Sequence, residues 1–130
     1  MADEAPTIAT IEDTIREVLL SDHVSFAELQ RIPGFKGDLE ICSAKYPNII
    51  FWAGVSRPAI QAMDRLIDAG EFHYHASTYL VYLADGCFLR LPIAKRAVDY
   101  KTPHWLPVCL KRGKGPCPGC ERHHRIRHGK

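Results

Sequence analysis

Apolar residues recur at helical spacing near the start of the chain and predict two short helices. The first has Thr10 as its N-cap and ends at Ser21 and Asp22. Its apolar face consists of Ile11, Ile15, Val18 and Leu19. The second opens with the capping-box sequence from Ser25 to Glu28. It buries Phe26, Leu29 and Ile32 and stops at Pro33-Gly34. After this pair, Gly37-Asp38 predicts a further short helix through Cys42, ending before Pro47.

Residues 48–91 predict a strand, a long helix and then a hairpin of short strands. The first strand, 49–52, is an apolar run rich in β-forming residues. The helix, 57–69, has Ser56 as its N-cap, Pro58 in its first turn and Gly70 just beyond its end. It turns Ile60, Met63 and Ile67 inward. The later strands are 72–75, 79–83 and 88–91, with a hairpin signal at Asp85-Gly86.

The two ends of the chain differ sharply in charge. Residues 1–89 hold 6 Lys and Arg against 13 Asp and Glu, a net charge of −7, and residues 90–130 hold 11 against 2, a net charge of +9. We therefore divide the chain into a folded domain over 1–91, a proline-interrupted connector over 92–108 and a basic tail over 109–130. Trp105 and Leu106 are expected to pack the connector onto the domain. A basic tail is typical of proteins that bind polyanions, and the alternative is a tail that stays solvated.

The order of two helices, a third helix and a strand hairpin over about residues 10–91 resembles the winged helix-turn-helix superfamily. The resemblance implies an α+β fold whose third helix enters the major groove of DNA, with a wing at about residues 73–78. Carried over to this chain, it makes Arg57, Gln61 and Arg65 the residues that contact the groove. The same helix also carries Asp64 and Asp68, and the wing has no Lys or Arg. A protein-interaction module or an ordinary solvated helix face therefore remains an alternative.

Cysteine and histidine gather at the end of the chain. Cys117 and Cys120 have the two-residue spacing of a zinc knuckle, and Cys109 lies eight residues upstream. Downstream, His124 is the preferred fourth ligand among several histidines. The four residues predict a closed tetrahedral zinc site that is structural and not catalytic. The alternative is a basic tail without fixed structure, with incidental cysteines. Cations surround the predicted site: Lys111, Arg112, Lys114, Arg122, Arg125 and Arg127.

These observations predict a non-enzymatic regulator of transcription that binds nucleic acid, with double-stranded DNA as the expected ligand. The cations of the tail would add affinity, and zinc would hold them in place. The competing interpretation is an adaptor or inhibitor that grips another protein. No nucleophile, base and orienting group can be identified together, which argues against an enzyme. The sequence has no apolar run of membrane-spanning length and starts with the acidic sequence MADEAPT, so we expect a cytoplasmic protein without membrane contact.

Overall fold

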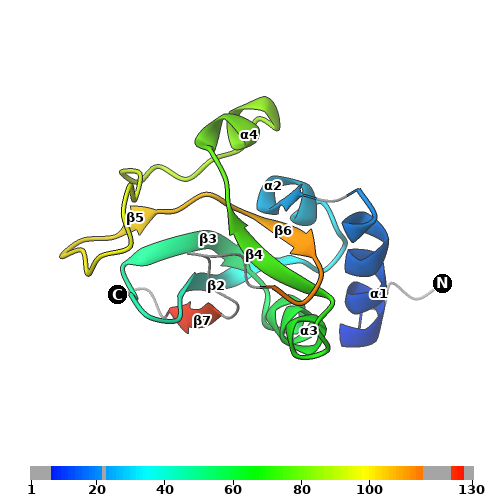
Figure 1. Ribbon diagram of the computed structural model, residues 1–130. Helices are drawn as coiled ribbons and strands as arrows, with labels where there is room; N and C mark the ends of the chain where they lie inside the picture. Colours follow the sequence, from blue (N-terminus) through cyan, green and yellow to red (C-terminus); the bar gives the residue numbers. More distant parts are fainter. Residues whose placement is uncertain (1–6, 22, 116–123, 128–130) are drawn as a thin grey trace.

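A computed structural model describes residues 7–21, 23–115 and 124–127. The described chain is a mixed α+β fold with two β-sheets (Figure 1). The three-stranded sheet has the order β1 (Val24–Ser25), β6 (Val108–Arg112), β4 (Phe72–Ala76). The four-stranded sheet has the order β5 (His104–Trp105), β3 (Ile49–Val55), β2 (Lys36–Ser43), β7 (His124–Arg127). All these neighbouring strands are antiparallel except β3 and β5, which are parallel.

In the described part of the chain, four helices connect or cover these strands: α1 (Ile8–Leu19), α2 (Phe26–Leu29), α3 (Arg57–Asp68) and α4 (Tyr79–Ala84). In Figure 1, α1 and α3 lie beside the sheets, whereas α4 stands apart from them on the side away from α3. The long helices form for local reasons. Ser56 caps α3 by accepting a hydrogen bond from the backbone N–H of Ala59 at 3.1 Å, and Gly70 adopts a φ of +74° just beyond the end of the helix.

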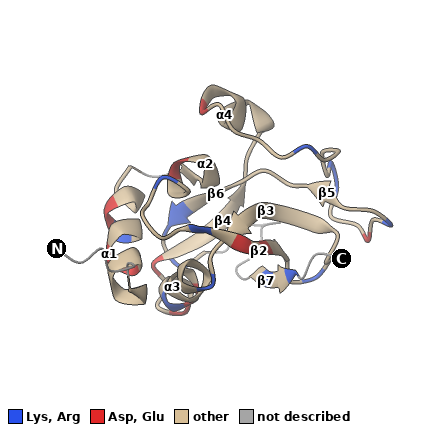
Figure 2. Cartoon of the chain, turned by 180° about the vertical axis from the view of Figure 1, so that it is seen from behind, with Lys and Arg blue, Asp and Glu red and all other residues tan. Residues whose placement is uncertain are grey.

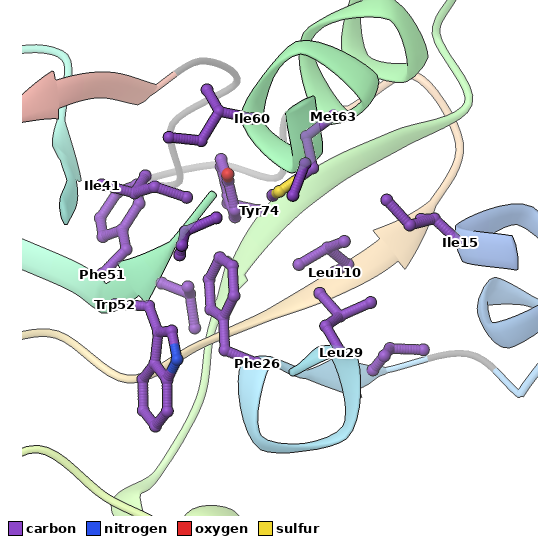
Figure 3. Close-up of a cluster of buried hydrophobic side chains, with 14 of the residues drawn as sticks. Ile15, Phe26, Leu29, Ile41, Phe51, Trp52, Ile60, Met63, Tyr74 and Leu110 are labelled. Atoms are coloured by element: carbon purple, nitrogen blue, oxygen red, sulfur yellow. The ribbon is translucent and has the colours of Figure 1, made fainter. Parts of the chain in front are cut away.

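Aromatic rings at the centre of the core join the two sheets (Figure 3). The ring of Phe26 stacks on Trp52 at 6.0 Å between centroids, with the planes 4° apart. Tyr74 lies 6.2 Å from Phe26 and 5.0 Å from Phe51 between ring centroids. All four residues are nearly inaccessible to solvent. Because rings from α2, β3 and β4 share one cluster, burial of apolar surface holds both sheets together.

One side chain fastens α4 to this core. The hydroxyl of Tyr82 donates a hydrogen bond to the carbonyl of Val108 at 2.5 Å and accepts one from the backbone N–H of Phe26 at 3.0 Å. Its ring also meets the ring of Trp105 edge-on, at 5.0 Å between centroids. Tyr82 is the buried residue of α4, so this side chain sets where the helix lies.

Several elements match the sequence-based expectations. The capping box of Ser25 and Glu28 is formed, and α3 and its cap lie where they were predicted. The strand expected at 49–52 is present and runs on to Val55. Trp105 is buried, as the packing of the connector required. The first helix begins earlier than predicted, because Thr7 and not Thr10 supplies the N-cap.

Other expectations were wrong. The helix expected after Gly37-Asp38 is strand β2, and the strand expected at 79–83 is helix α4. The partner of β4 is therefore β6, and not a hairpin strand at 79–83. Within the described residues, the strand expected at 88–91 is absent. The α+β class is confirmed, whereas the winged helix is not.

The contacts of Tyr82 lead to a prediction about stability. Replacing Tyr82 by Phe leaves a buried N–H and a buried carbonyl without their partner, which should lower the free energy of unfolding by about 1–3 kcal/mol. Urea denaturation followed by circular dichroism measures this change. The control is Tyr79→Phe in the same helix, where the side chain is 47% exposed and the change should stay below about 0.5 kcal/mol. Equal effects of the two substitutions would contradict the anchoring role of Tyr82.

Candidate functional site

Three segments far apart in the sequence meet around the side chain of Asn48. Its amide nitrogen donates a hydrogen bond to the carbonyl of Tyr100 at 2.8 Å, and its amide oxygen accepts one from Arg127 Nη2 at 3.3 Å. The backbone carbonyl of Asn48 accepts a hydrogen bond from the N–H of His104 at 2.8 Å. Arg125 Nη1 approaches the carbonyl of Ala44 at 3.5 Å. The turn between β2 and β3, the segment before β5, and β7 therefore form one edge of the molecule.

This edge carries a surplus of positive charge. We call it the basic edge and define it by Lys45, Lys95, Arg96, Lys101, Arg125 and Arg127. Among the described carboxylates, Glu40 pairs with Arg127 at 2.7 Å, and Asp99 lies between Arg96 and Lys101 in the sequence. Figure 2 shows the blue segments of β7 and of the chain around β5 on the same side of the molecule.

Aromatic rings lie among these cations. The rings of Tyr100 and His104 stack at 3.8 Å between centroids, with the planes 17° apart. The hydroxyl of Tyr100 accepts a hydrogen bond from the backbone N–H of Arg96 at 3.2 Å and donates one to its carbonyl at 3.1 Å. Lys45 Nζ lies 5.5 Å from the ring centre of Tyr46. The segment that carries Lys95, Arg96 and Lys101 is therefore held in shape by Tyr100.

A buried polar contact fixes strand β7 to the rest of the fold. The hydroxyl of Tyr74 lies 2.6 Å from His124 Nδ1, and the side chain of His124 is 2% exposed. Burial raises the pKa of Tyr74, so its hydroxyl stays protonated and shares a hydrogen bond with the ring. His124 Nε2 then faces Asp64 of α3, with 2.9 Å to Oδ1, at an ion-pair distance but without a well-directed hydrogen bond. This contact positions Arg125 and Arg127, the next cations along the strand.

The face of α3 that was predicted to read DNA lies beside acidic side chains of α1. Arg57, Gln61 and Arg65 are exposed, as expected. However, Arg65 Nη1 lies 3.5 Å from Glu12 of α1, and this part of the surface is acidic. Arg16 there donates to Glu12, to Asp13 and to Glu71, the last at 2.7 Å. The hydrogen bond from Arg16 lowers the pKa of Glu71. The helix thus offers little uncompensated positive charge.

The remaining predicted cations form a second group, at the end of β6. Lys111 and Arg112 lie opposite His73 and Phe72 of β4. Lys114 lies against Gly70, and the N–H of Gly113 donates to the carbonyl of Glu71 at 3.1 Å. These residues therefore neighbour the acidic end of α3, and Arg122 lies outside the described residues. Of the cations predicted from the tail, Arg125 and Arg127 belong to the basic edge.

The predicted zinc ligands are only partly described, because Cys117 and Cys120 lie outside the described residues. Cys109 is buried in β6, and burial raises the pKa of its thiol. It points to the opposite face of that strand from Leu110, which is paired with Tyr74 and shares its core face. His124 contacts Tyr74 on that core side. In the described part of the chain no group of three or more His, Cys, Asp and Glu side chains is arranged to hold a metal.

No protein-family model, curated protein or solved structure matches this chain. Among the described residues, no helix is long and apolar enough to cross a membrane. The candidate site is therefore supported by the contacts around Asn48 and not by similarity to a known protein.

Sequence reasoning missed four cations of the basic edge: Lys45, Lys95, Arg96 and Lys101. Lys45 follows a strand that was expected to be a helix, and the other three lie in the segment treated as a connector. A local signal does exist, since Lys45-Tyr46 and Tyr100-Lys101 each place a cation beside an aromatic residue. What joins these pairs is the set of hydrogen bonds around Asn48, which sequence spacing does not reveal.

The contact between Tyr74 and His124 leads to a second prediction. Tyr74→Phe removes the buried hydroxyl and leaves His124 Nδ1 without its hydrogen-bond partner, so amide hydrogen exchange over residues 124–127 should become faster. Asp64→Asn should have a smaller effect, because Asp64 is 50% exposed. Hydrogen-exchange mass spectrometry measures both variants. Unchanged exchange over 124–127 in Tyr74→Phe would show that another contact holds the strand.

The zinc site stays a prediction, and the geometry sharpens its test. Elemental analysis of protein purified without chelator should give about one zinc per chain, and Cys117→Ser should remove it. His124→Gln should leave the zinc content unchanged, because the ring nitrogens of His124 already face Tyr74 and Asp64. A content below about one-tenth of a zinc per chain in the unmodified protein would end the metal hypothesis.

Proposed function

We propose that this protein is a non-enzymatic nucleic-acid-binding protein that holds a single strand along its basic edge. The observation that carries the proposal is the set of contacts around Asn48, which joins the segments that carry the six cations and the stacked aromatic pair. Cations bind the phosphates of a nucleic acid in any sequence, and they supply much of its binding free energy. Nothing in this arrangement requires a catalytic group.

The composition of the edge favours a single strand over a duplex. Proteins that bind single strands combine a cationic track with aromatic rings on which bases stack. Tyr100 and His104 provide such rings, and Lys45, Lys101 and Arg125 of the basic edge are exposed. The basic edge consists of turns, irregular chain and a short strand, whereas reading of duplex DNA commonly places a helix in the major groove.

The earlier expectation, in which a winged helix reads duplex DNA through α3, gains less support from the geometry. Arg65 is paired with Glu12, and Asp64 on the same helix faces His124. Arg65 of this helix is already paired with a carboxylate, and further carboxylates lie nearby. Their negative charge would repel the phosphates of a duplex. Duplex binding through Arg57 and Gln61 is therefore the competing outcome of the experiment below, and regulation of transcription would be a consequence of that outcome.

Fluorescence anisotropy with a labelled oligonucleotide of about 12 nucleotides tests the proposal, in single-stranded and duplex form. We expect the single strand to bind more tightly, with an affinity that falls with salt by a slope of about −0.7 per phosphate contacted. The double variant Lys45→Glu/Lys101→Glu should weaken binding at least about tenfold at low salt, because it reverses two charges of the edge.

The matched control is Arg57→Glu/Arg65→Glu, which reverses two charges on α3. It should change the affinity less than about twofold, because α3 lies outside the basic edge. Tight duplex binding that is lost in the α3 variant and kept in the edge variant would refute the proposal. Absence of binding by both nucleic-acid forms at low salt would refute it as well.

A further inference from the structure

Helix α4 exposes a row of large apolar side chains. Tyr79 is 47% exposed, Leu80 60%, Leu83 45%, and Phe88 in the chain that follows 51%. In Figure 1 this helix stands apart from the two sheets. Single exposed apolar residues are common on protein surfaces, but a contiguous group of them marks an interaction site. Tyr79, Leu83 and Phe88 line one groove, so these three side chains form a contiguous group.

The same region is hollowed. A groove of about 340 Å³ lies between α4 and residues 88–93, with Tyr79, Leu83 and Phe88 among its lining residues. The groove reaches the buried indole of Trp105. A concave apolar surface of this size can accept large side chains from a partner, as recognition grooves for helical segments do.

The charge around the groove indicates what the partner carries. Among the described residues that line it, Arg90 is the charged one. The neighbouring carboxylate of Asp85 accepts a hydrogen bond from Ser25 Oγ at 2.8 Å. The groove is therefore apolar with the cation of Arg90 in its lining, and it complements an apolar segment that bears a carboxylate.

A second copy of the chain fits this surface poorly. A two-fold contact between copies would place the same patch on both sides, and the described lining residues include no carboxylate that could pair with Arg90 of the other copy. A lipid surface also fits less well, because the apolar residues line a concavity in addition to the helix face. The occupant that complements both shape and charge is a short segment of another protein.

We propose that the groove beside α4 docks a short acidic segment of a partner protein. Two or three large apolar side chains of that segment fill the groove, and an adjacent Asp or Glu pairs with Arg90. This interaction goes beyond the proposed binding of nucleic acid and uses a different surface. The protein would then bring a nucleic acid and a partner protein together on one chain.

Selection from a phage-displayed library of random peptides of about 12 residues, against the full chain, tests the proposal. We expect the enriched peptides to combine Leu, Phe or Trp with Asp or Glu. A synthetic peptide of the enriched sequence should lose at least about tenfold in affinity for Leu83→Ser and for Phe88→Ser. The matched control is Leu20→Ser, which removes an apolar residue that is 69% exposed at the end of α1 and should leave the affinity unchanged.

A charge exchange tests the role of Arg90. Arg90→Glu should weaken the selected peptide, and a peptide with Lys in place of its acidic residue should recover affinity for this variant. Circular dichroism of each variant confirms that it is folded. Binding of the single-stranded oligonucleotide should be unchanged in Leu83→Ser and Phe88→Ser, so failure of the docking proposal is distinguishable from failure of nucleic-acid binding.

Three results would overturn the proposal. Enriched peptides without acidic residues, bound equally by Arg90→Glu, would remove the charge argument. Sedimentation of the unmodified protein as a dimer that Phe88→Ser converts to a monomer would assign the groove to a second copy. Binding to vesicles that contain anionic lipid, lost in Leu80→Ser and Phe88→Ser without any peptide selection, would assign the surface to a membrane.

Discussion

The described fold depends on the pairing of β6 with two strands at once. Residues 108–112 come late in the chain, yet they lie between β1 and β4, with Leu110 opposite both Val24 and Tyr74. A strand in this position satisfies the backbone groups of both neighbours, so neither β1 nor β4 would keep its partner without it. The hydroxyl of Tyr82 also binds the carbonyl of Val108, which ties α4 to the same strand. The separation of these partners in sequence means that the fold depends on long-range contacts.

The side chain of Tyr74 connects this three-stranded sheet to the four-stranded sheet. Tyr74 lies in β4 beside β6, and its hydroxyl meets His124 at the start of β7, in the four-stranded sheet. The pairing of β7 with β2 then places Arg127 opposite Glu40, and the amide of Asn48 joins Arg127 to the carbonyl of Tyr100. A continuous set of contacts therefore leads from the core to the basic edge. The charge that we assign to nucleic-acid binding is presented by buried contacts and not by a loose tail.

Local sequence signals identified the elements whose structure is decided locally. The caps of α2 and α3 and the apolar stripe of α3 each lie within a few residues, and each was predictable. Residues 79–83 show where this reasoning fails. Tyr79, Val81 and Tyr82 favour strands, but the hydrogen bonds of Tyr82 to β6 and α2 select a helix. Likewise, residues 36–43 form a strand because β3 and β7 pair with them from both sides. In the candidate site, Arg125 and Arg127 were predictable from charge, whereas their neighbours across Asn48 depend on tertiary contacts.

The central claim is that nucleic acid binds at the basic edge, and NMR mapping tests it most directly. Backbone amide signals would be recorded during titration with an unlabelled single-stranded oligonucleotide. We expect the largest shifts at residues 44–48, 95–104 and 125–127, where the cations and the stacked rings lie. Signals from the exposed face of α3, including Arg57 and Gln61, should stay in place. Shifts concentrated on α3 with none around Asn48 would contradict the assignment of the basic edge.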